Sequence, residues 1–221
     1  KSKLINAEIL KINADNIKDL FSYLKKSKRP VIIGGWGIHL AGCENEFVKL
    51  VNTLNVPTAL TWGGADLLPH NHKNNVGTFG THGTRHGNFT VQNADFILSI
   101  GSRLDTKATG TPVNTFARDA YKVVVDIDQN EIDKLDMDLS VSISCDASEF
   151  IKAMIDVEIL SHLDWKSWRF RCSDWKSRYT VNDGKPFHQT GTISHYQLVD
   201  ALSEVIPEHT LISTGSSGLG V

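Results

Sequence analysis

Five segments between residues 29 and 132 decide the fold: RPVIIGGWGIHLAG (29–42), VPTALTWGGADLLP (56–69), VGTFGTHG (76–83), ADFILSIGSRLDTKATG (94–110) and YKVVVDIDQNEI (121–132). In most of these segments a short apolar run leads directly into glycine or aspartate. Such runs, bounded by turn residues, are typical of strands in an α/β sheet. The glycines stand where a ligand would need access to the backbone. We therefore predict one α/β unit of the nucleotide-binding type.

Helical patterns separate these strands. Residues 15–26 place apolar side chains at Ile17, Leu20, Phe21 and Leu24, on one helical face. Further helices are predicted over residues 44–54, 84–93 and 147–155, and strands over residues 31–33, 57–60, 95–100, 122–127 and 141–144. The alternation of strands and helices favours a doubly wound, mostly parallel sheet with helices on both faces.

Composition places the chain among ordinary globular proteins. Of its 221 residues, 40% are apolar and 22% are charged, and the formal net charge is −2. This balance offers no basic surface for nucleic acid, and the apolar runs are too short to cross a bilayer. The three cysteines, Cys43, Cys145 and Cys172, are far apart and form no metal-binding pair. We therefore expect a cytoplasmic protein without a nucleic-acid or membrane partner.

The character of the chain changes after residue 157. We expect residues 1–13 to be a connector and residues 14–157 to be the central α/β domain. Residues 158–192 are interpreted as a linker whose helix carries three of the five tryptophans among basic residues. We expect this surface helix to pack its tryptophans on neighbouring domains rather than to bind nucleic acid. Residues 193–221 resemble the first part of another α/β domain, cut off early, so we expect a longer polypeptide.

A glycine-rich turn follows the first predicted strand. Gly34, Gly35, Gly37 and Gly42 stand between a strand and a helix, where backbone N–H groups can meet a pyrophosphate. Their spacing differs from the G-x-G-x-x-G of dinucleotide dehydrogenases, and the bulky Trp36 lies inside the turn. A tight turn without a ligand therefore stays an alternative to a phosphate site.

Charged residues follow two further strands. Asp126 and Asp128 end the run VVVDID, where an acidic side chain accepts hydrogen bonds from a ribose or caps the next helix. Arg103 follows Gly101 at the end of another strand and pairs either with a phosphate or with a carboxylate such as Asp105. The sequence leaves both pairs of alternatives open.

Histidines cluster at His70, His72, His82 and His86. His82 and His86 have the i, i+4 spacing of metal ligands on a helix, but no cysteine or carboxylate stands at a matching distance. We therefore predict no metal site and place a loop histidine beside a cofactor. The sequence has neither a G-x-S-x-G nucleophile elbow nor a P-loop.

In their order and spacing, these segments resemble the central domain of the acetolactate synthase family of thiamine-diphosphate enzymes. The resemblance covers about residues 10–157 and includes VVVDIDQNEIDK (123–134). The later segment SHYQLVDALSEVIPEHTLISTGSSG (194–218) resembles the start of that family's third, diphosphate-binding domain. The resemblance implies a Rossmann-like, DHS-like nucleotide-binding domain followed by a truncated α/β tail.

In flavin-containing members of the family, the central domain binds FAD. The resemblance implies that the FAD diphosphate or ribitol lies near Gly34, Gly35 and Gly37, and that the flavin lies near Thr61, Trp62, Gly80 and His82. The family's G-x-R-x-D-x-R segment corresponds to Gly101, Arg103, Asp105 and Lys107. The adenosine end corresponds to Asp126, Asp128, Glu131 and Ile132. Ser216, Ser217 and Gly218 match positions near the thiamine diphosphate.

Two departures from the family pattern bear on the nucleotide. Lys107 stands where the family has arginine, and Trp36 stands where it has glycine. Relatives without flavin bind ADP or CoA in this domain, or bind nothing. FAD, another adenine nucleotide and an empty domain therefore all stay open.

For the whole protein, the resemblance implies thiamine diphosphate and Mg²⁺ as cofactors and a homodimer or homotetramer. The implied reaction is decarboxylation of pyruvate or another 2-oxo acid, followed by ligation to an acceptor. The family's catalytic glutamate and metal motif lie in its first and third domains, so we expect this chain alone to be inactive and assign no catalytic residue. A non-catalytic nucleotide-binding module or structural domain on the same fold is the alternative.

Overall fold

The computed structural model describes residues 13–155, 163–180, 185–187, 190–207 and 210–212. The chain divides into two compact units, Lys1–Lys176 and Ser177–Val221. The first unit holds a six-stranded sheet. The described helix of the second unit is α9 (His195–Val205).

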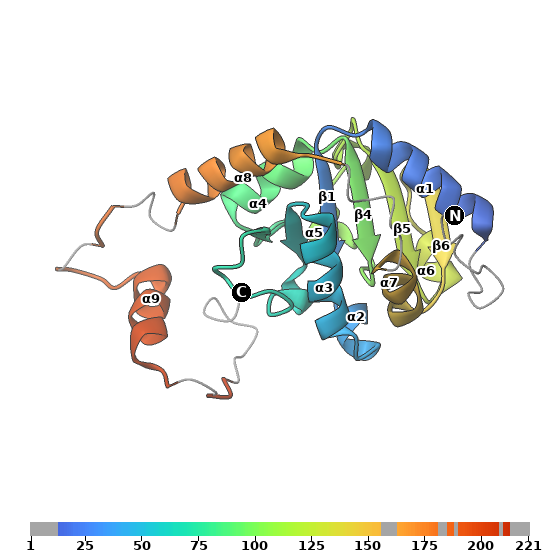
Figure 1. Ribbon diagram of the computed structural model, residues 1–221. Helices are drawn as coiled ribbons and strands as arrows, with labels where there is room; N and C mark the ends of the chain where they lie inside the picture. Colours follow the sequence, from blue (N-terminus) through green and yellow to red (C-terminus); the bar gives the residue numbers. More distant parts are fainter. Residues whose placement is uncertain (1–12, 156–162, 181–184, 188–189, 208–209, 213–221) are drawn as a thin grey trace. The chain divides into compact units, whose positions relative to one another are not determined.

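All six strands of the sheet are parallel, in the order β3-β2-β1-β4-β5-β6 (Figure 1). The strands are β1 (Pro30–Gly34), β2 (Thr58–Leu60), β3 (Asn75–Thr78), β4 (Phe96–Ile100), β5 (Tyr121–Asp126) and β6 (Val141–Ser144). This is the doubly wound order in which the winding direction reverses between the first and fourth strands. The predicted fold class is confirmed.

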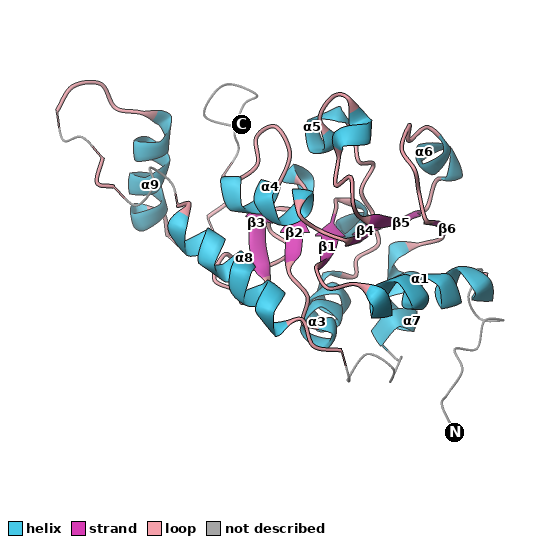
Figure 2. Cartoon of the chain, turned by 90° about the horizontal axis from the view of Figure 1, so that it is seen from above, coloured by secondary structure: helices cyan, strands magenta, loops and turns pink. Residues whose placement is uncertain are grey.

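Helices cover both faces of the sheet. They are α1 (Ala14–Lys26), α2 (Gly37–Leu40), α3 (Glu44–Leu54), α4 (Arg85–Gln92), α5 (Thr106–Thr109), α6 (Gln129–Asp133), α7 (Ala147–Ile155) and α8 (Lys166–Arg178), with short 3-10 turns η1 (Trp62–Gly64) and η2 (Val113–Thr115). Figure 2 shows α1, α3 and α7 on one side of the strands and α4 on the other. Because both faces are covered, every residue of β1 and β4 is buried.

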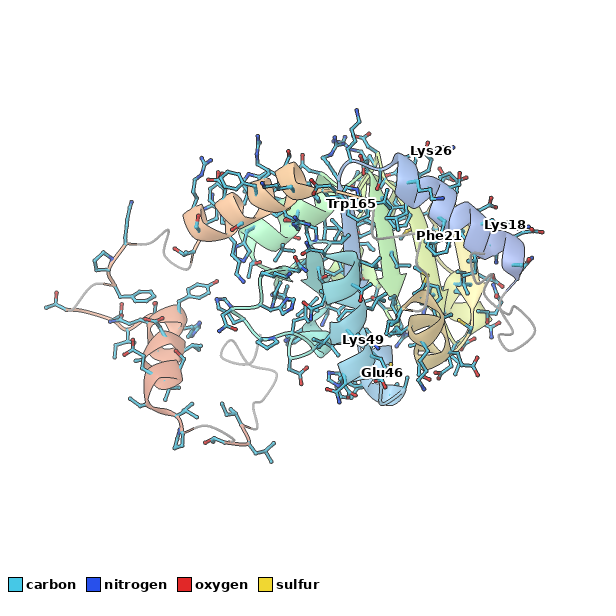
Figure 3. All side chains as sticks on the ribbon, in the orientation of Figure 1. Lys18, Phe21, Lys26, Glu46, Lys49 and Trp165 are labelled. Carbon is cyan, nitrogen blue, oxygen red and sulfur yellow. The ribbon has the colours of Figure 1, made fainter. Side chains whose placement is uncertain are left out.

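The sequence of α1 determines both its start and its buried face. The Asn13 side chain accepts a hydrogen bond from the Asp15 N–H and so caps the first turn. The predicted apolar face is buried. In Figure 3, Phe21 lies on the side of α1 that faces the sheet, whereas Lys18 and Lys26 lie on its outer side.

Two tryptophans, Trp168 in α8 and Trp165 just before it, pack within the first unit. The indole N–H of Trp165 donates to the Ser27 carbonyl (3.1 Å), and that of Trp168 donates to the Pro30 carbonyl (3.0 Å). Both side chains are almost fully buried and belong to the main core. We expected packing on neighbouring domains, but these two indoles donate to the carbonyl of Ser27, before β1, and to that of Pro30, the first residue of β1. The compact unit accordingly continues to Lys176.

The helix α9 begins at a side-chain cap. Ser194 Oγ accepts a hydrogen bond from the Gln197 N–H. Ser216, Ser217 and Gly218 lie outside the described residues, so their predicted contact with thiamine diphosphate stays a prediction. Within the part of the chain that is described, no helix has the length and apolar character needed to cross a membrane.

Candidate nucleotide site

A cavity of about 670 Å³ lies at the carboxyl ends of the strands. Loops that follow β1, β2, β3, β4, β5 and β6 all contribute to its lining. In doubly wound sheets, ligands bind at this edge, beside the point where the strand order reverses. The volume lies within the range of about 300 to 1,000 Å³ that is usual for small-molecule sites.

The glycine turn after β1 packs directly on the turn after β4. The Gly35 N–H donates to the Ile100 carbonyl (3.0 Å), and the Gly37 N–H donates to the Gly101 carbonyl (2.9 Å). A Cβ added at Gly37 would lie 2.7 Å from Gly101 Cα, so the two backbones approach more closely than any side chain allows. Both N–H groups therefore donate to carbonyls of the protein itself. The turn contributes to the shape of the cavity through its close packing on the turn after β4.

Two exposed tryptophans form an aromatic wall of the cavity. Trp36, from the loop after β1, is 54% exposed, and Trp62, from the loop after β2, is 51% exposed. Lys107 Nζ lies 5.6 Å from the centre of the Trp62 ring, within the range of a cation–π contact. The His82 ring lies 6.1 Å from the same indole. This wall therefore presents both flat apolar faces and positive charge.

An ion-pair network forms another part of the lining. Arg103 Nε–H donates to Glu131 Oε2 at 2.8 Å, and Lys134 also pairs with this carboxylate. Hydrogen bonds from Lys134 and Arg103 lower the pKa of Glu131 below its ordinary value. Asp126 lies beside them, and its Oδ1 accepts from the Asp128 N–H at 3.0 Å. Of the two alternatives for Arg103, the structure shows a carboxylate partner, Glu131 rather than Asp105.

Most of the predicted site residues meet in this cavity. Those that line it are Gly37, Thr61, Trp62, His82, Gly101, Arg103, Asp105, Lys107, Asp126 and Glu131.

Five predicted residues are not part of the cavity lining. Gly34 and Gly35 are buried, and so is Ile132. A Cβ added at Gly80 would lie 2.3 Å from the Lys107 carbonyl. Asp128 caps α6, because its side chain accepts from the Asn130 N–H. Of the two alternatives for Asp128, helix capping is the one that the structure shows.

The cavity also includes residues that the sequence patterns did not assign. The sequence patterns assign no ligand contact to the bulky Trp36, yet this residue forms part of the lining. Leu40, Phe79, Ile127 and Asp146 also line the cavity. Ile127 and Asp146 stand just after the ends of β5 and β6. Because ligand sites in this fold lie at strand ends, these positions could have been predicted from the sequence.

The two histidines with metal-ligand spacing lie in different environments. His82 is exposed at the cavity, whereas His86 is buried in α4. Among the residues that the structure describes, no three His, Cys, Asp or Glu side chains come together as a metal site would need.

Comparison with known proteins places this geometry in a family. Residues 17–154 match the family model described as "Thiamine pyrophosphate enzyme, central domain". The chain belongs to this family. The match covers most of the first unit, including every strand of the sheet and the whole cavity.

Several curated relatives are acetolactate synthases. A protein of Methanococcus aeolicus named "Probable acetolactate synthase large subunit" is 34% identical over 67% of this chain and 24% of its own length. The acetolactate synthase large subunit of Buchnera aphidicola subsp. Schlechtendalia chinensis is 30% identical over 79% of this chain and 31% of its own length. The acetolactate synthase isozyme 3 large subunit of Escherichia coli K12 is 30% identical over 73% of this chain and 29% of its own length. The chain thus spans about a quarter to a third of these relatives.

Proposed function

We propose that the full-length protein is a thiamine-diphosphate-dependent enzyme of the acetolactate synthase type. It would decarboxylate pyruvate or another 2-oxo acid and ligate the product to an acceptor. Family membership and the names of the relatives support this proposal. Thiamine diphosphate, held through Mg²⁺, would supply the electron sink for loss of CO₂.

Within that enzyme, we propose that this chain binds FAD or another adenine nucleotide. The observation that carries the proposal is the cavity at the β1–β4 reversal point, with flat aromatic and charged groups in one lining. The exposed face of Trp62 suits a planar ring. Asp126, Arg103 and Lys107 line the cavity. In this proposal Asp126 would accept a hydrogen bond from a ribose hydroxyl, and Arg103 and Lys107 would pair with phosphate.

The nucleotide domain would pack and orient the other domains, and the 221-residue chain alone would release no CO₂. We propose that the full-length protein acts in the cytoplasm as a homodimer or homotetramer.

Two measurements test the proposed function. The first is the absorbance spectrum of the purified full-length protein, followed by chromatography of the nucleotide released on denaturation. Released FAD supports the flavin-containing form, and ADP or CoA supports a form without flavin. If no nucleotide is released and none binds on addition, the proposed nucleotide site is wrong.

The second measurement is CO₂ release from pyruvate and other 2-oxo acids in the presence of thiamine diphosphate and Mg²⁺. Release that depends on both cofactors supports the enzyme. If no 2-oxo acid is decarboxylated while a nucleotide is bound, the result favours the non-catalytic binding module.

A further inference from the structure

His39, in the short helix α2, lies between two carboxylates from different parts of the chain. Its Nδ1 lies 2.8 Å from Glu44 Oε1, at the start of α3, and its Nε2 lies 2.9 Å from Asp66 Oδ1, in the loop after η1. The His39 side chain is 16% exposed, whereas that of Asp66 is 77% exposed. The histidine therefore links an interior turn to a surface loop.

This geometry specifies the charge of the imidazole. A neutral imidazole has one N–H, whereas the imidazolium donates from both ring nitrogens. Both ring nitrogens of His39 face an acceptor, so the imidazolium satisfies the arrangement. Burial alone lowers the pKa of His39, but the hydrogen bonds and charges of Glu44 and Asp66 outweigh it and raise the pKa above its ordinary value.

The two segments that His39 links carry the two tryptophans of the cavity wall. Trp36 precedes α2, and its ring centre lies 4.9 Å from that of His39. Trp62 begins the loop that continues to Asp66. The segments touch, since a Cβ added at Gly63 would lie 3.3 Å from Trp36 Cβ. The bridge from His39 to Asp66 thus spans the contact on which the wall depends.

We propose that His39, as an imidazolium, is a positioning residue that locks the Trp62 loop (residues 61–68) against the Trp36 turn (residues 35–42). The lock sets the spacing of the two indoles and so favours binding of a ligand with a planar ring. The ligand part of this inference rests on the proposed nucleotide site. His39 itself does not line the cavity and acts through Trp36 and Asp66.

The raised pKa determines the direction of the pH dependence. The charged groups that face the ring are Glu44 from α3 and Asp66 from the loop, and α2 itself has no other charged residue. A histidine whose pKa is higher in the folded state contributes its full stabilisation below the ordinary value of about 6.5. That contribution is lost as the pH rises through the higher, folded-state value. The lock therefore opens on the alkaline side.

Hydrogen–deuterium exchange of the full-length protein tests the lock without a ligand. At about pH 6, where an ordinary histidine is largely protonated, His39→Gln is expected to speed exchange in peptides from residues 35–42 and 61–68. At about pH 9 the wild type should exchange as fast as the variant, after correction for the intrinsic rate. The matched control is His72→Gln, because His72 lies outside the cavity lining. This variant should leave the exchange rates of both peptides unchanged.

The comparison separates a charged lock from simple packing. If His39 acts only by filling space, the variant differs from the wild type equally at both pH values, and the proposal is overturned. An absence of any difference at about pH 6 overturns it as well. Loss of the difference at alkaline pH supports it.

Titration with FAD as the probe tests the effect on the ligand. The wild-type affinity is expected to fall about two- to fivefold between these pH values, the range that one partly exposed ion pair supplies. His39→Gln should bind with the weaker affinity throughout. If affinity does not change with pH in the wild type, the lock has no role in binding. If FAD does not bind at any pH, the nucleotide site fails, and the exchange experiment alone decides the lock.

Discussion

Gly35 is a residue whose smallness is required by a neighbouring backbone. A Cβ at this position would lie 2.3 Å from the Gly101 carbonyl oxygen and 2.7 Å from Ser102 Cβ. Separating the two turns would disturb the junction of β1 and β4, where the cavity begins. Gly42 is a contrasting case, since its φ of +59° is left-handed but an added Cβ meets no described atom within 4 Å.

We therefore expect Gly35→Ala to destabilise the 221-residue chain by about 3 kcal/mol. Gly42→Ala should cost about 1 kcal/mol, because it pays only for the left-handed backbone. Urea unfolding of the two variants measures the difference. Equal losses would show that the predicted clash relaxes without cost.

Arg103 and Lys134 provide a matched pair of cations at one carboxylate. Both contact Glu131, but Arg103 lines the cavity and Lys134 does not. We expect Arg103→Ala to weaken FAD or ADP binding by roughly tenfold, because it removes a charged hydrogen-bond donor from the cavity. Lys134→Ala should change affinity little. Calorimetric titration of the full-length protein measures both, and equal effects would remove Arg103 from the site.

At the scale of elements, α8 has a structural role that its sequence pattern does not predict. Its pattern lacks a clear apolar stripe, yet Trp168 within it and Trp165 just before it are buried and donate to the Pro30 and Ser27 carbonyls. Arg169 adds a hydrogen bond from Nη1 to the Asn55 carbonyl at 3.0 Å. The helix thus stabilises the first unit through a few side chains that donate hydrogen bonds to backbone carbonyls.

We expect Trp168→Ala to lower the free energy of unfolding by about 3 to 5 kcal/mol, the usual cost of removing a buried large aromatic side chain. The control is Phe170→Ala on the same helix. Phe170 is 76% exposed, so its loss should change stability by less than about 0.5 kcal/mol. A small effect at Trp168 would mean that α8 is only loosely attached.

The strand β3 (Asn75–Thr78) was not predicted, for a physical reason. Its sequence, NVGT, has one large apolar residue, and Gly77 has a φ of +85°. The strand lies at the sheet edge and pairs with β2 through an irregular register. Its formation therefore depends on the neighbouring strand rather than on its own periodicity.

At the scale of the whole molecule, the first compact unit ends at Lys176, within α8. We expect a variant that ends after Arg178 to unfold in one cooperative transition. A variant that ends after Ile155 loses Trp165, Trp168 and Cys172 from the core and should be less stable by more than about 3 kcal/mol. Thermal unfolding followed by circular dichroism compares them, and equal midpoints would place the end of the folding unit before α8.

The sequence alone determined the elements whose causes are local. The spacing of Ile17, Leu20 and Leu24 predicted α1, and the run before Asp126 predicted β5. Strand ends that carry glycine or charge indicated the edge where the cavity lies. The family resemblance named ten of the 24 residues that line it, because ligand sites in this fold recur at strand ends.

The tertiary structure decided every property that depends on residues far apart in the chain. It brought Glu131 rather than Asp105 to Arg103, packed Gly35 directly against Gly101, and placed Trp36 in the lining of the cavity. Strand order controls these pairings, because it sets which loops become neighbours at the carboxyl edge. Local spacing contains no information about strand order, and so these contacts could not be predicted from the sequence.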